Sequence, residues 1–420
     1  MRTFTFKGLF LTAVFMLLGC LSIQAADDDL ITKQITVKLD KAGTLPNKIG
    51  SSKKYLITNL KIIGEINGTD LRMIREMAGS DHIGDTTEGK LSVLDLSEAR
   101  IVRGGDYYYS HYDYNYCTSN DVIGTSAFKG CSGLTSLNLP ASITEIGGSA
   151  FYGCSGLTNI TLPSSITKIG YHAFYDCSGL TSLNIPDGIT SIGDNAFEGC
   201  SGLTSLNLPA GITRISDYAF YGCSGLTSLN IPSSITEIGS YAFWGCSGLT
   251  SLTLPSSITE IGGNAFRDCR GLTSLNLPAG ITEIGDYAFK GCSGLTSLNL
   301  PAGITEIGSN AFRDCSGLTS IYVYSEKVPK MYSDVFKGCD AKKCILYVPK
   351  GTYDDYWLSD FGYFENIVEF DATGIDKTTT STDVEEVSRY SVNGQRLVGP
   401  TKGLNIVKYS DGSVKKVAAL

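Results

Sequence analysis

The sequence predicts a solenoid, in which one short unit winds repeatedly around a common axis. Nine cysteines recur every 23 residues from Cys131 to Cys315. Between them the chain, 420 residues long, repeats the unit CSGLTSLNLPASITEIGGSAFYG with small changes. A self-similar unit of this length is typical of arrays in which each repeat packs only against its neighbours. We therefore expect one elongated array rather than several globular domains.

Each unit begins with the strand signature of a leucine-rich repeat. The pattern LxxLxL places three apolar side chains after every cysteine, at Leu134, Leu137 and Leu139 in the first unit. Side chains alternate along a strand, so Leu137 and Leu139 point inward and Asn138 points outward. Pro140 has no N–H to donate and ends the strand.

The second half of each unit closes the winding. Ile143 and Ile146 indicate another short extended segment, and the pair Ala150-Phe151 indicates a short helical turn. In some units an aspartate stands just before this pair, as Asp217 does, and is a candidate N-cap. The fold class is therefore a leucine-rich-repeat solenoid of the α/β type, with mostly short parallel strands plus short helical turns.

The cysteine column is predicted to be buried. Equivalent residues in adjacent coils lie about 5 Å apart, a distance that alone permits bonding. Stacked side chains point the same way, however, which suits a column of thiols better than disulfides. Redox or metal chemistry is the alternative, but a spacing of 23 residues matches no zinc signature. We expect no metal site and no cofactor.

The first 26 residues predict an export signal. Two basic residues precede an apolar run over residues 9–18, and small residues lead up to Asp27. Cleavage near Ala25–Ala26 would leave a soluble mature chain. In the alternative, the segment LLGC resembles a bacterial lipobox, and Cys20 would carry a lipid.

Residues 27–130 predict an N-terminal cap with divergent repeats. The strand pattern returns in ITNLKI and LSVLDL, and residues 69–79 between them predict a helix. Aligning Leu91 with Leu134 gives 43 residues where a repeat has 23, so 20 are inserted. The insertion contains six tyrosines, Tyr107, Tyr108, Tyr109, Tyr112, Tyr114 and Tyr116. Such rings suit a recognition loop, or they merely cover the edge of the first coils.

The regular repeats occupy residues 131–320 and then degrade. Residues 321–370 contain one more pair like Ala-Phe, namely Val335-Phe336. They then become rich in aromatic residues, as expected of capping repeats. Residues 371–386 are rich in threonine and aspartate and predict a linker. Residues 387–420 predict a small C-terminal β-module, because Asn393-Gly394 stands between two strand-like runs.

Composition excludes several classes of function. The formal net charge is −8, and a chain without a basic surplus is not expected to bind nucleic acid. Only three histidines are present and no carboxylates pair with hydrolase spacing, so we expect no enzyme and no catalytic residues. After the export signal no stretch is long and apolar enough to cross a bilayer, which leaves a lipid on Cys20 as the only membrane attachment expected.

The repeat AFxGCSGLTSLxLPxSITxIG resembles the BspA-like, or treponemal-type, leucine-rich repeat of bacterial surface proteins. The match is close from Cys131 to Thr319 and looser over residues 57–370, where INGTDLRMIREMAG and LYVPKGTYDDY resemble members from Bacteroidetes. The resemblance implies surface display and, in some members, binding of host matrix or plasma proteins, with no catalytic residues. The tail SVNGQRLVGPTKGLNIVKYSDGSVKKV is similar to the end of C-terminal sorting domains in that phylum, in a shorter form.

Binding residues are expected where the repeat varies, on either side of the Ala-Phe pair. These positions predict an aromatic patch on two adjacent coils, followed by a basic strip, with residue types enriched in binding hot spots. The candidates are Tyr218, Tyr221, Tyr241, Trp244, Arg267, Lys290 and Arg313. Alternatively, the aromatics only pad the turn. The strand face repeats Thr135, Ser136 and Asn138, an uncharged surface that suits avidity along a repetitive ligand or is simply solvated.

These observations predict a secreted or cell-surface binding protein, adhesin-like, that recognises host or microbial proteins or glycans through the solenoid surface. Its partner would be an extracellular protein or glycan, and its location the outer membrane, the cell surface or the extracellular space. The alternative is a structural spacer or stalk without its own ligand, which the near-identity of the coils favours.

Overall fold

The computed structural model describes residues 29–372, 386–391, 396–397, 403–409 and 414–419. The chain divides into two compact units, Met1–Phe370 and Asp371–Leu420. The predicted export signal with Cys20, and the predicted turn at Asn393-Gly394, lie outside the described residues.

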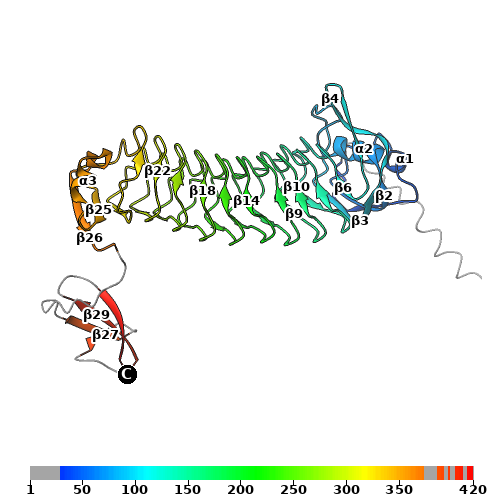
Figure 1. Ribbon diagram of the computed structural model, residues 1–420. Helices are drawn as coiled ribbons and strands as arrows, with labels where there is room; N and C mark the ends of the chain where they lie inside the picture. The colour runs from blue at the N-terminus through cyan, green and yellow to red at the C-terminus, as the bar shows by residue number, and fades with distance from the viewer. Residues whose placement is uncertain (1–28, 373–385, 392–395, 398–402, 410–413, 420) are drawn as a thin grey trace, which may run out of the picture. The chain divides into compact units, whose positions relative to one another are not determined.

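The first unit is a solenoid whose coils stack along one axis (Figure 1). Each regular coil gives one strand to a wide column, in which most neighbours pair in parallel with equivalent residues opposite each other, as Leu206 and Leu229 are. The pairing is interrupted twice, between Asn159–Thr161 and Ser182–Asn184 and between Ser228–Asn230 and Leu252–Thr253. Along Ser205–Asn207 the pattern is exposed, buried, exposed, as alternation requires. The predicted solenoid of short parallel strands is confirmed. The wide column comprises β7 (Ser136–Asn138), β9 (Asn159–Thr161), β11 (Ser182–Asn184), β13 (Ser205–Asn207), β15 (Ser228–Asn230), β17 (Leu252–Thr253), β19 (Ser274–Asn276), β21 (Ser297–Leu300) and β23 (Ser320–Val323).

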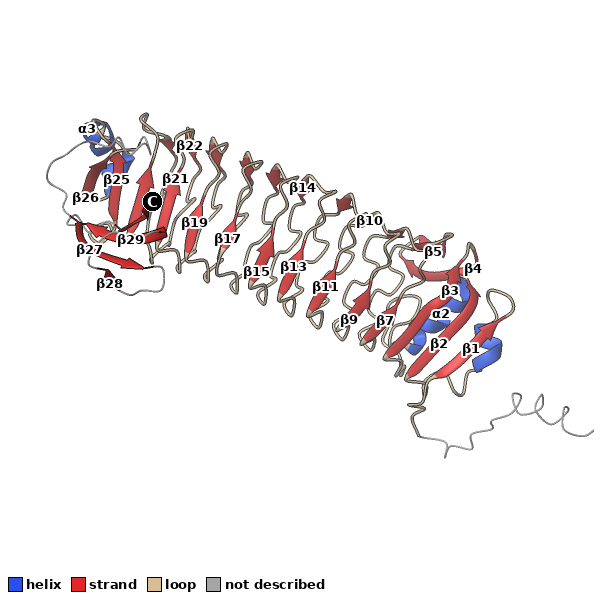
Figure 2. Ribbon diagram, turned by 90° about the horizontal axis from the view of Figure 1, so that it is seen from below, coloured by secondary structure: helices blue, strands red, loops and turns tan. Residues whose placement is uncertain are grey.

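A narrow column of two-residue strands lies beyond each proline turn (Figure 2). Its isoleucines point into the core, and its polar partners point out, as Ile238 and Glu237 do. The narrow column comprises β6 (Val122–Ile123), β8 (Glu145–Ile146), β10 (Lys168–Ile169), β12 (Ser191–Ile192), β14 (Arg214–Ile215), β16 (Glu237–Ile238), β18 (Glu260–Ile261), β20 (Glu283–Ile284), β22 (Glu306–Ile307) and β24 (Lys330–Met331).

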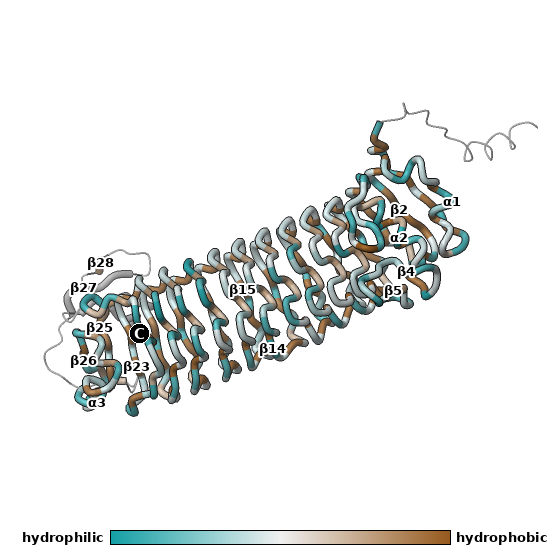
Figure 3. The backbone as a smooth tube through the Cα atoms, turned by 90° about the horizontal axis from the view of Figure 1, so that it is seen from above, coloured by the Kyte–Doolittle hydropathy of each residue, from teal (hydrophilic) through white to brown (hydrophobic). Residues whose placement is uncertain are grey.

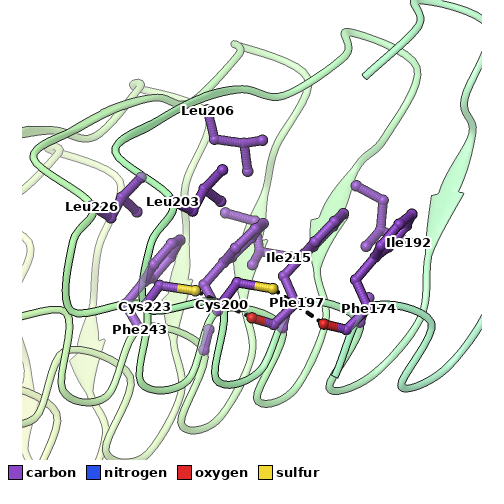
Figure 4. Close-up of a cluster of buried hydrophobic side chains, with 14 of the residues drawn as sticks. Phe174, Ile192, Phe197, Cys200, Leu203, Leu206, Ile215, Cys223, Leu226 and Phe243 are labelled. Carbon is purple, nitrogen blue, oxygen red and sulfur yellow. Dashed lines mark hydrogen bonds between the residues drawn. The ribbon is translucent and has the colours of Figure 1, made fainter. Parts of the chain in front are cut away.

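Apolar residues recur at the same place in every coil and fill the interior (Figure 3). Phenylalanine rings stack from Phe128 to Phe336, with centroids 5.1–5.6 Å apart. Beside them each column cysteine from Cys154 onward donates its S–H to a phenylalanine carbonyl of the preceding coil, as Cys200 does to Phe174 at 3.1 Å (Figure 4). These thiols are free and buried, and burial raises the pKa of Cys223 to about 12. The prediction of a buried thiol column is confirmed.

The Ala-Phe segment differs from the predicted helical turn. Its N–H groups bond three residues back, as Tyr152 does to Ser149 at 3.1 Å, but the residue before each alanine has a left-handed φ of 51° to 60°. A left-handed residue ends a right-handed helix, so consecutive tight turns form instead. Asp217 also differs from the predicted N-cap, because its carboxylate accepts the N–H of Ser240 in the next coil at 3.0 Å.

These turns carry a third ladder between coils, here called the turn ladder. At each of nine junctions, three N–H groups of one coil donate to three carbonyls of the next, at 2.7–3.0 Å. At the first junction Phe128 donates to Ala150, and at the last Phe312 donates to Val335. All of these bonds run in the same direction, so the ladder has a carbonyl end and an N–H end.

The N-terminal cap extends the wide column with β1 (Ile35–Leu39), β2 (Asn59–Ile66) and β3 (Val93–Ile101). The predicted helix is present as α2 (Gly68–Met77), where Asn67 and Asp70 form a capping box, and α1 (Leu45–Ile49) precedes it. The tyrosine insertion forms an antiparallel hairpin of β4 (Gly104–His111) and β5 (Tyr114–Thr118).

The C-terminal cap adds β25 (Ile345–Pro349) and β26 (Asn366–Phe370) to the wide column, with α3 (Tyr353–Trp357) and the 3-10 helix η1 (Asp360–Tyr363) between them. The second unit is a small antiparallel sheet in the order β28-β27-β29-β30. The described strands of that unit are β27 (Glu386–Ser391), β28 (Arg396–Leu397), β29 (Gly403–Tyr409) and β30 (Val414–Ala419).

Candidate functional site

The strand face, formed by the outward threonine, serine and asparagine side chains of the wide column, is exposed and uncharged. Most threonine hydroxyls of this face donate to the threonine carbonyl of the coil before, as Thr227 does to Thr204 at 3.1 Å, whereas those of Thr181 and Thr250 do not. The hydroxyl protons are therefore used inside the array, while the hydroxyl oxygens and the asparagine amides face solvent. A hollow of about 320 Å³ lies over β13, β15 and β17, and its polar lining comes from Ser205, Asn207, Ser228, Asn230 and Thr253.

The six tyrosines of the β4–β5 hairpin separate into three environments. Two are buried, two are half-buried and two are exposed: respectively Tyr108 and Tyr109, Tyr107 and Tyr116, and Tyr112 and Tyr114. Tyr112 and Tyr114 are 88% and 72% exposed at the hairpin turn. The structure thus uses Tyr108 and Tyr109 to cover the first coils, and only the tip of the hairpin has free rings to offer a partner.

The variable residues beside the Ala-Phe turns lie together along one edge of the array, here called the turn ridge. The ridge consists of Tyr218, Tyr221, Tyr241, Trp244, Arg267, Tyr287, Lys290 and Arg313, all half-buried. The rings of Tyr218 and Tyr241 stack at 4.5 Å with an angle of 3° between their planes. Trp244 stacks on Tyr241 at 5.4 Å and carries the guanidinium of Arg267 at 4.1 Å. The sequence therefore identified residues that the fold does bring together.

The same contacts limit which side-chain groups of the turn ridge a partner could reach. Ring faces are used between coils, so mainly ring edges and hydroxyls reach solvent. The basic strip is also partly neutralised, because Arg313 lies 3.5 Å from the Asp334 carboxylate and Arg267 lies 3.6 Å from Asp268. Tyr218 additionally adopts a left-handed φ of 55°, which costs a bulky residue about 1–3 kcal/mol. Padding of the turn accounts for these contacts, and binding by the ridge stays a prediction.

A column of glutamates runs along the narrow strands in register, at Glu237, Glu260, Glu283 and Glu306. Basic residues close its two ends, with Arg214 2.9 Å from Glu237 and Lys330 3.9 Å from Glu306. The charged residues that line the hollow of about 480 Å³ beside it are Arg214, Asp217, Glu237, Glu260 and Glu283. Like charges at the spacing of parallel strands repel, so this column is a solvated edge rather than acid–base machinery.

Within the described ranges, no group of His, Cys, Asp or Glu has an arrangement that could hold a metal ion. Cys117 is exposed, whereas the other described cysteines are buried. The part of the chain described also contains no helix of sufficient length and apolarity to span a bilayer.

Arg75 is a residue that the sequence did not identify. It is fully buried in α2, and its guanidinium donates to the carbonyls of Ala127 at 3.1 Å and Lys129 at 3.0 Å. The hydroxyl of Tyr108 donates to the remaining carbonyl, that of Thr125, at 2.8 Å. These three carbonyls are the carbonyl end of the turn ladder, so Arg75 and Tyr108 close it. Only their burial distinguishes them from Arg72 and Tyr107, and no sequence pattern signals that burial.

Comparison with known proteins gives a family match over the array. A family model for the BspA type leucine rich repeat region matches residues 121–249 and 236–350. Among solved structures, a leucine-rich repeat protein of T. pallidum is 32% identical over 47% of this chain and 84% of its own, with a TM-score of 0.35. A leucine-rich repeat protein of Bacteroides ovatus is 24% identical over 61% and 90%, with a TM-score of 0.29. A leucine rich cell surface protein of Faecalibacterium prausnitzii is 23% identical over 64% and 86%, with a TM-score of 0.32. No curated protein matches the chain.

Proposed function

The chain belongs to the family of BspA-type leucine-rich repeat proteins, and from this premise we propose that it is an exported, adhesin-like binding protein displayed on the cell surface or secreted. Its ligand is an extended, repetitive protein or glycan of host or microbial origin, held along the strand face. Export rests on the predicted N-terminal signal, with a lipid on Cys20 or release after Ala26 as the two routes of processing.

The single observation that supports this function most is the regularity of the strand face. Asparagine amides of successive coils lie in register, and the Asn299 amide donates to the Asn276 carbonyl at 2.6 Å. Most coils therefore offer the same donors and acceptors at the same spacing, with threonine replacing asparagine at Thr161 and Thr253. Many weak, identical contacts to a repetitive ligand add through effective concentration, whereas a single compact ligand would gain from only one or two coils.

Binding to a purified mucin and to a purified extracellular-matrix protein tests this proposal. We expect Asn207→Arg with Asn230→Arg, at the hollow on the strand face, to weaken binding about tenfold or more. The matched control is Thr190→Arg with Thr213→Arg on the exposed side of the narrow column, which should leave binding unchanged. Equal loss in both variants, or no binding to either probe, would count against the strand face.

A second candidate is a structural spacer, favoured by the way that the coils use their own surface groups. Threonine hydroxyls and turn-ridge rings contact neighbouring coils, as in the stacked pair Tyr218 and Tyr241 at 4.5 Å. A spacer has no soluble ligand, and its cellular phenotype depends on the number of coils. Deleting one complete coil, residues 200–222, separates the two candidates, because avidity falls only modestly while a length-dependent phenotype changes directly.

A further inference from the structure

The N-terminal end of the turn ladder is closed by the chain itself. Arg75 and Tyr108 donate hydrogen bonds to the three turn-ladder carbonyls of the first coil. A neighbouring copy stacked on this end would find no free acceptors there. The ladder therefore presents unfilled backbone groups only at its other end.

At the C-terminal end, three N–H groups complete the pattern of the ladder without an acceptor. They belong to Asp334, Phe336 and Gly338, here called the donor row, and no described residue accepts a hydrogen bond from any of them. Phe336 is only 3% exposed, so bulk water has little access to it. A buried backbone N–H without a partner costs free energy comparable to a lost hydrogen bond.

The C-terminal cap covers the last coil only in part. Rings of Phe361 and Phe364 pack on Phe336, at 5.8 and 5.2 Å between centroids. Beside them a hollow of about 570 Å³ remains between the last turn and η1. Asp334 and Phe336 of the donor row line this hollow, together with Met331, Tyr332 and Tyr363, whereas Gly338 lies outside its lining. The two tyrosines are 43% and 44% exposed, so the hollow has free aromatic surface at its rim.

The charges around the hollow disfavour an anion. Asp334 and Asp360 both line it, with Lys337 as the only basic residue of the lining. Lys337 is already paired with the Asp334 carboxylate at 3.1 Å. The three donors are also spread along the chain, as they are at every junction, instead of converging on one point. The site calls for several neutral acceptors in a row, which a polypeptide backbone supplies.

We propose that the donor row binds a neutral peptide segment of another protein, whose alternate backbone carbonyls accept from Asp334, Phe336 and Gly338. The segment would take the place of one further coil, as in strand addition to a sheet edge. Side chains of the segment would contact Tyr332 and Tyr363 at the rim, which supply selectivity. This site is separate from the strand face and does not depend on the function proposed above.

The test uses the mature chain and a phage-displayed library of uncharged dodecapeptides as the probe. We expect selected peptides to bind with an affinity that Tyr332→Ala reduces about tenfold. Tyr353→Ala, an exposed tyrosine of the same cap outside the hollow, is the matched control and should leave the affinity unchanged. Bound peptide should slow hydrogen exchange at the amides of the donor row about tenfold and leave the already bonded amide of Phe312 unaffected.

Five results would overturn the proposal. One is a selection that yields no binding peptide, and another is a peptide that binds without slowing exchange in the donor row. Displacement of the peptide by inorganic phosphate would identify an anion site instead. Slow exchange of the donor row in the free chain at all concentrations would mean that the chain covers it, and slow exchange only at high concentration would assign it to a second copy.

Discussion

The regular coils and the N-terminal cap satisfy buried groups in different ways. In the coils the N–H and carbonyl groups of the turn ladder bond to their equivalents in the neighbouring coils, and each phenylalanine ring stacks on another, so one short sequence serves nine times. The cap has no such neighbour on its outer side and closes the array with Arg75 and Tyr108, which occur once. Identical repeats can extend an array but cannot end it, and ending it requires residues of a different kind.

Alkaline pH should give the largest difference in stability between the regular coils and the N-terminal cap. The pKa of a thiol in the unfolded chain is about 8.5, whereas burial raises it to about 12 for Cys223 and Cys292. Stability from the buried thiols is therefore complete below about 8.5 and is lost as the pH rises towards 12. Urea unfolding from pH 7 to about 10, below the range in which the buried Tyr108 of the cap would ionise on unfolding, should show a falling midpoint for the coils. The cap, whose only described cysteine before Cys131 is exposed, should not follow in this range.

A variant with alanine at Cys200, Cys223, Cys246 and Cys269 is the control for that titration. It starts less stable at neutral pH because four side chains lose packing. Its midpoint should then fall less steeply with pH than that of the unchanged chain. An equal slope in both proteins would show that the thiols do not cause the effect.

Arg75→Met should make the closed end of the turn ladder resemble the open one. The substitution removes a fully buried cation and leaves the carbonyls of Ala127 and Lys129 without a donor. We expect the cap and first coil to lose about 3–5 kcal/mol of local stability. Hydrogen exchange of α2 and the first coils measures this loss. Arg72→Met, at a half-buried position of the same helix, is the control and should cost less than about 1 kcal/mol.

Tyr108→Phe should give a smaller effect of the same kind. The ring stays in place, but the hydroxyl that donates to Thr125 at 2.8 Å is lost. A single unpaired carbonyl costs about 1–3 kcal/mol. By the same exchange measurement, the local stability of this variant should lie between those of the unchanged chain and Arg75→Met. A loss as large as that of Arg75→Met would contradict the assignment of two ladder carbonyls to Arg75 and one to Tyr108.

Asp176→Gly should give the smallest effect and should be stabilising. Asp176 has a left-handed φ of 54° where the equivalent residue of most coils is glycine, as in Gly199 at 73°. Glycine adopts this conformation without steric cost, so we expect a gain of about 0.5–1 kcal/mol. Gly199→Ala is the reciprocal control and should destabilise, since its new methyl group would meet the Asp176 carboxylate. Thermal unfolding of both variants tests the sign.

The periodic part of the molecule could be predicted from the sequence because each contact repeats every 23 residues. The positions of Leu137, Cys131 and Phe151 in the unit were enough to predict strand, thiol column and core. The turn ladder could not be predicted, since asparagine and histidine, which favour a left-handed φ, alternate at this position with serine and tyrosine, which do not.

The candidate sites were predictable only as far as they repeat. Regular spacing brought Tyr241 and Trp244 together on one edge, but the stacking that uses their ring faces depends on side-chain packing. The insertion has no period, so the sequence did not separate buried Tyr108 from exposed Tyr112. The donor row was missed because a backbone group without an acceptor leaves no trace in residue types.

Residue-resolved hydrogen exchange of the free mature chain tests the central claim most directly, namely that the coils form one continuous array with a one-way turn ladder. The amides of Phe151, Phe220 and Phe312, which donate to the next coil, should be strongly protected, and that of Phe336 should exchange faster than all three. Equal protection of Phe336, or rapid exchange at Phe220 in the middle of the array, would contradict it.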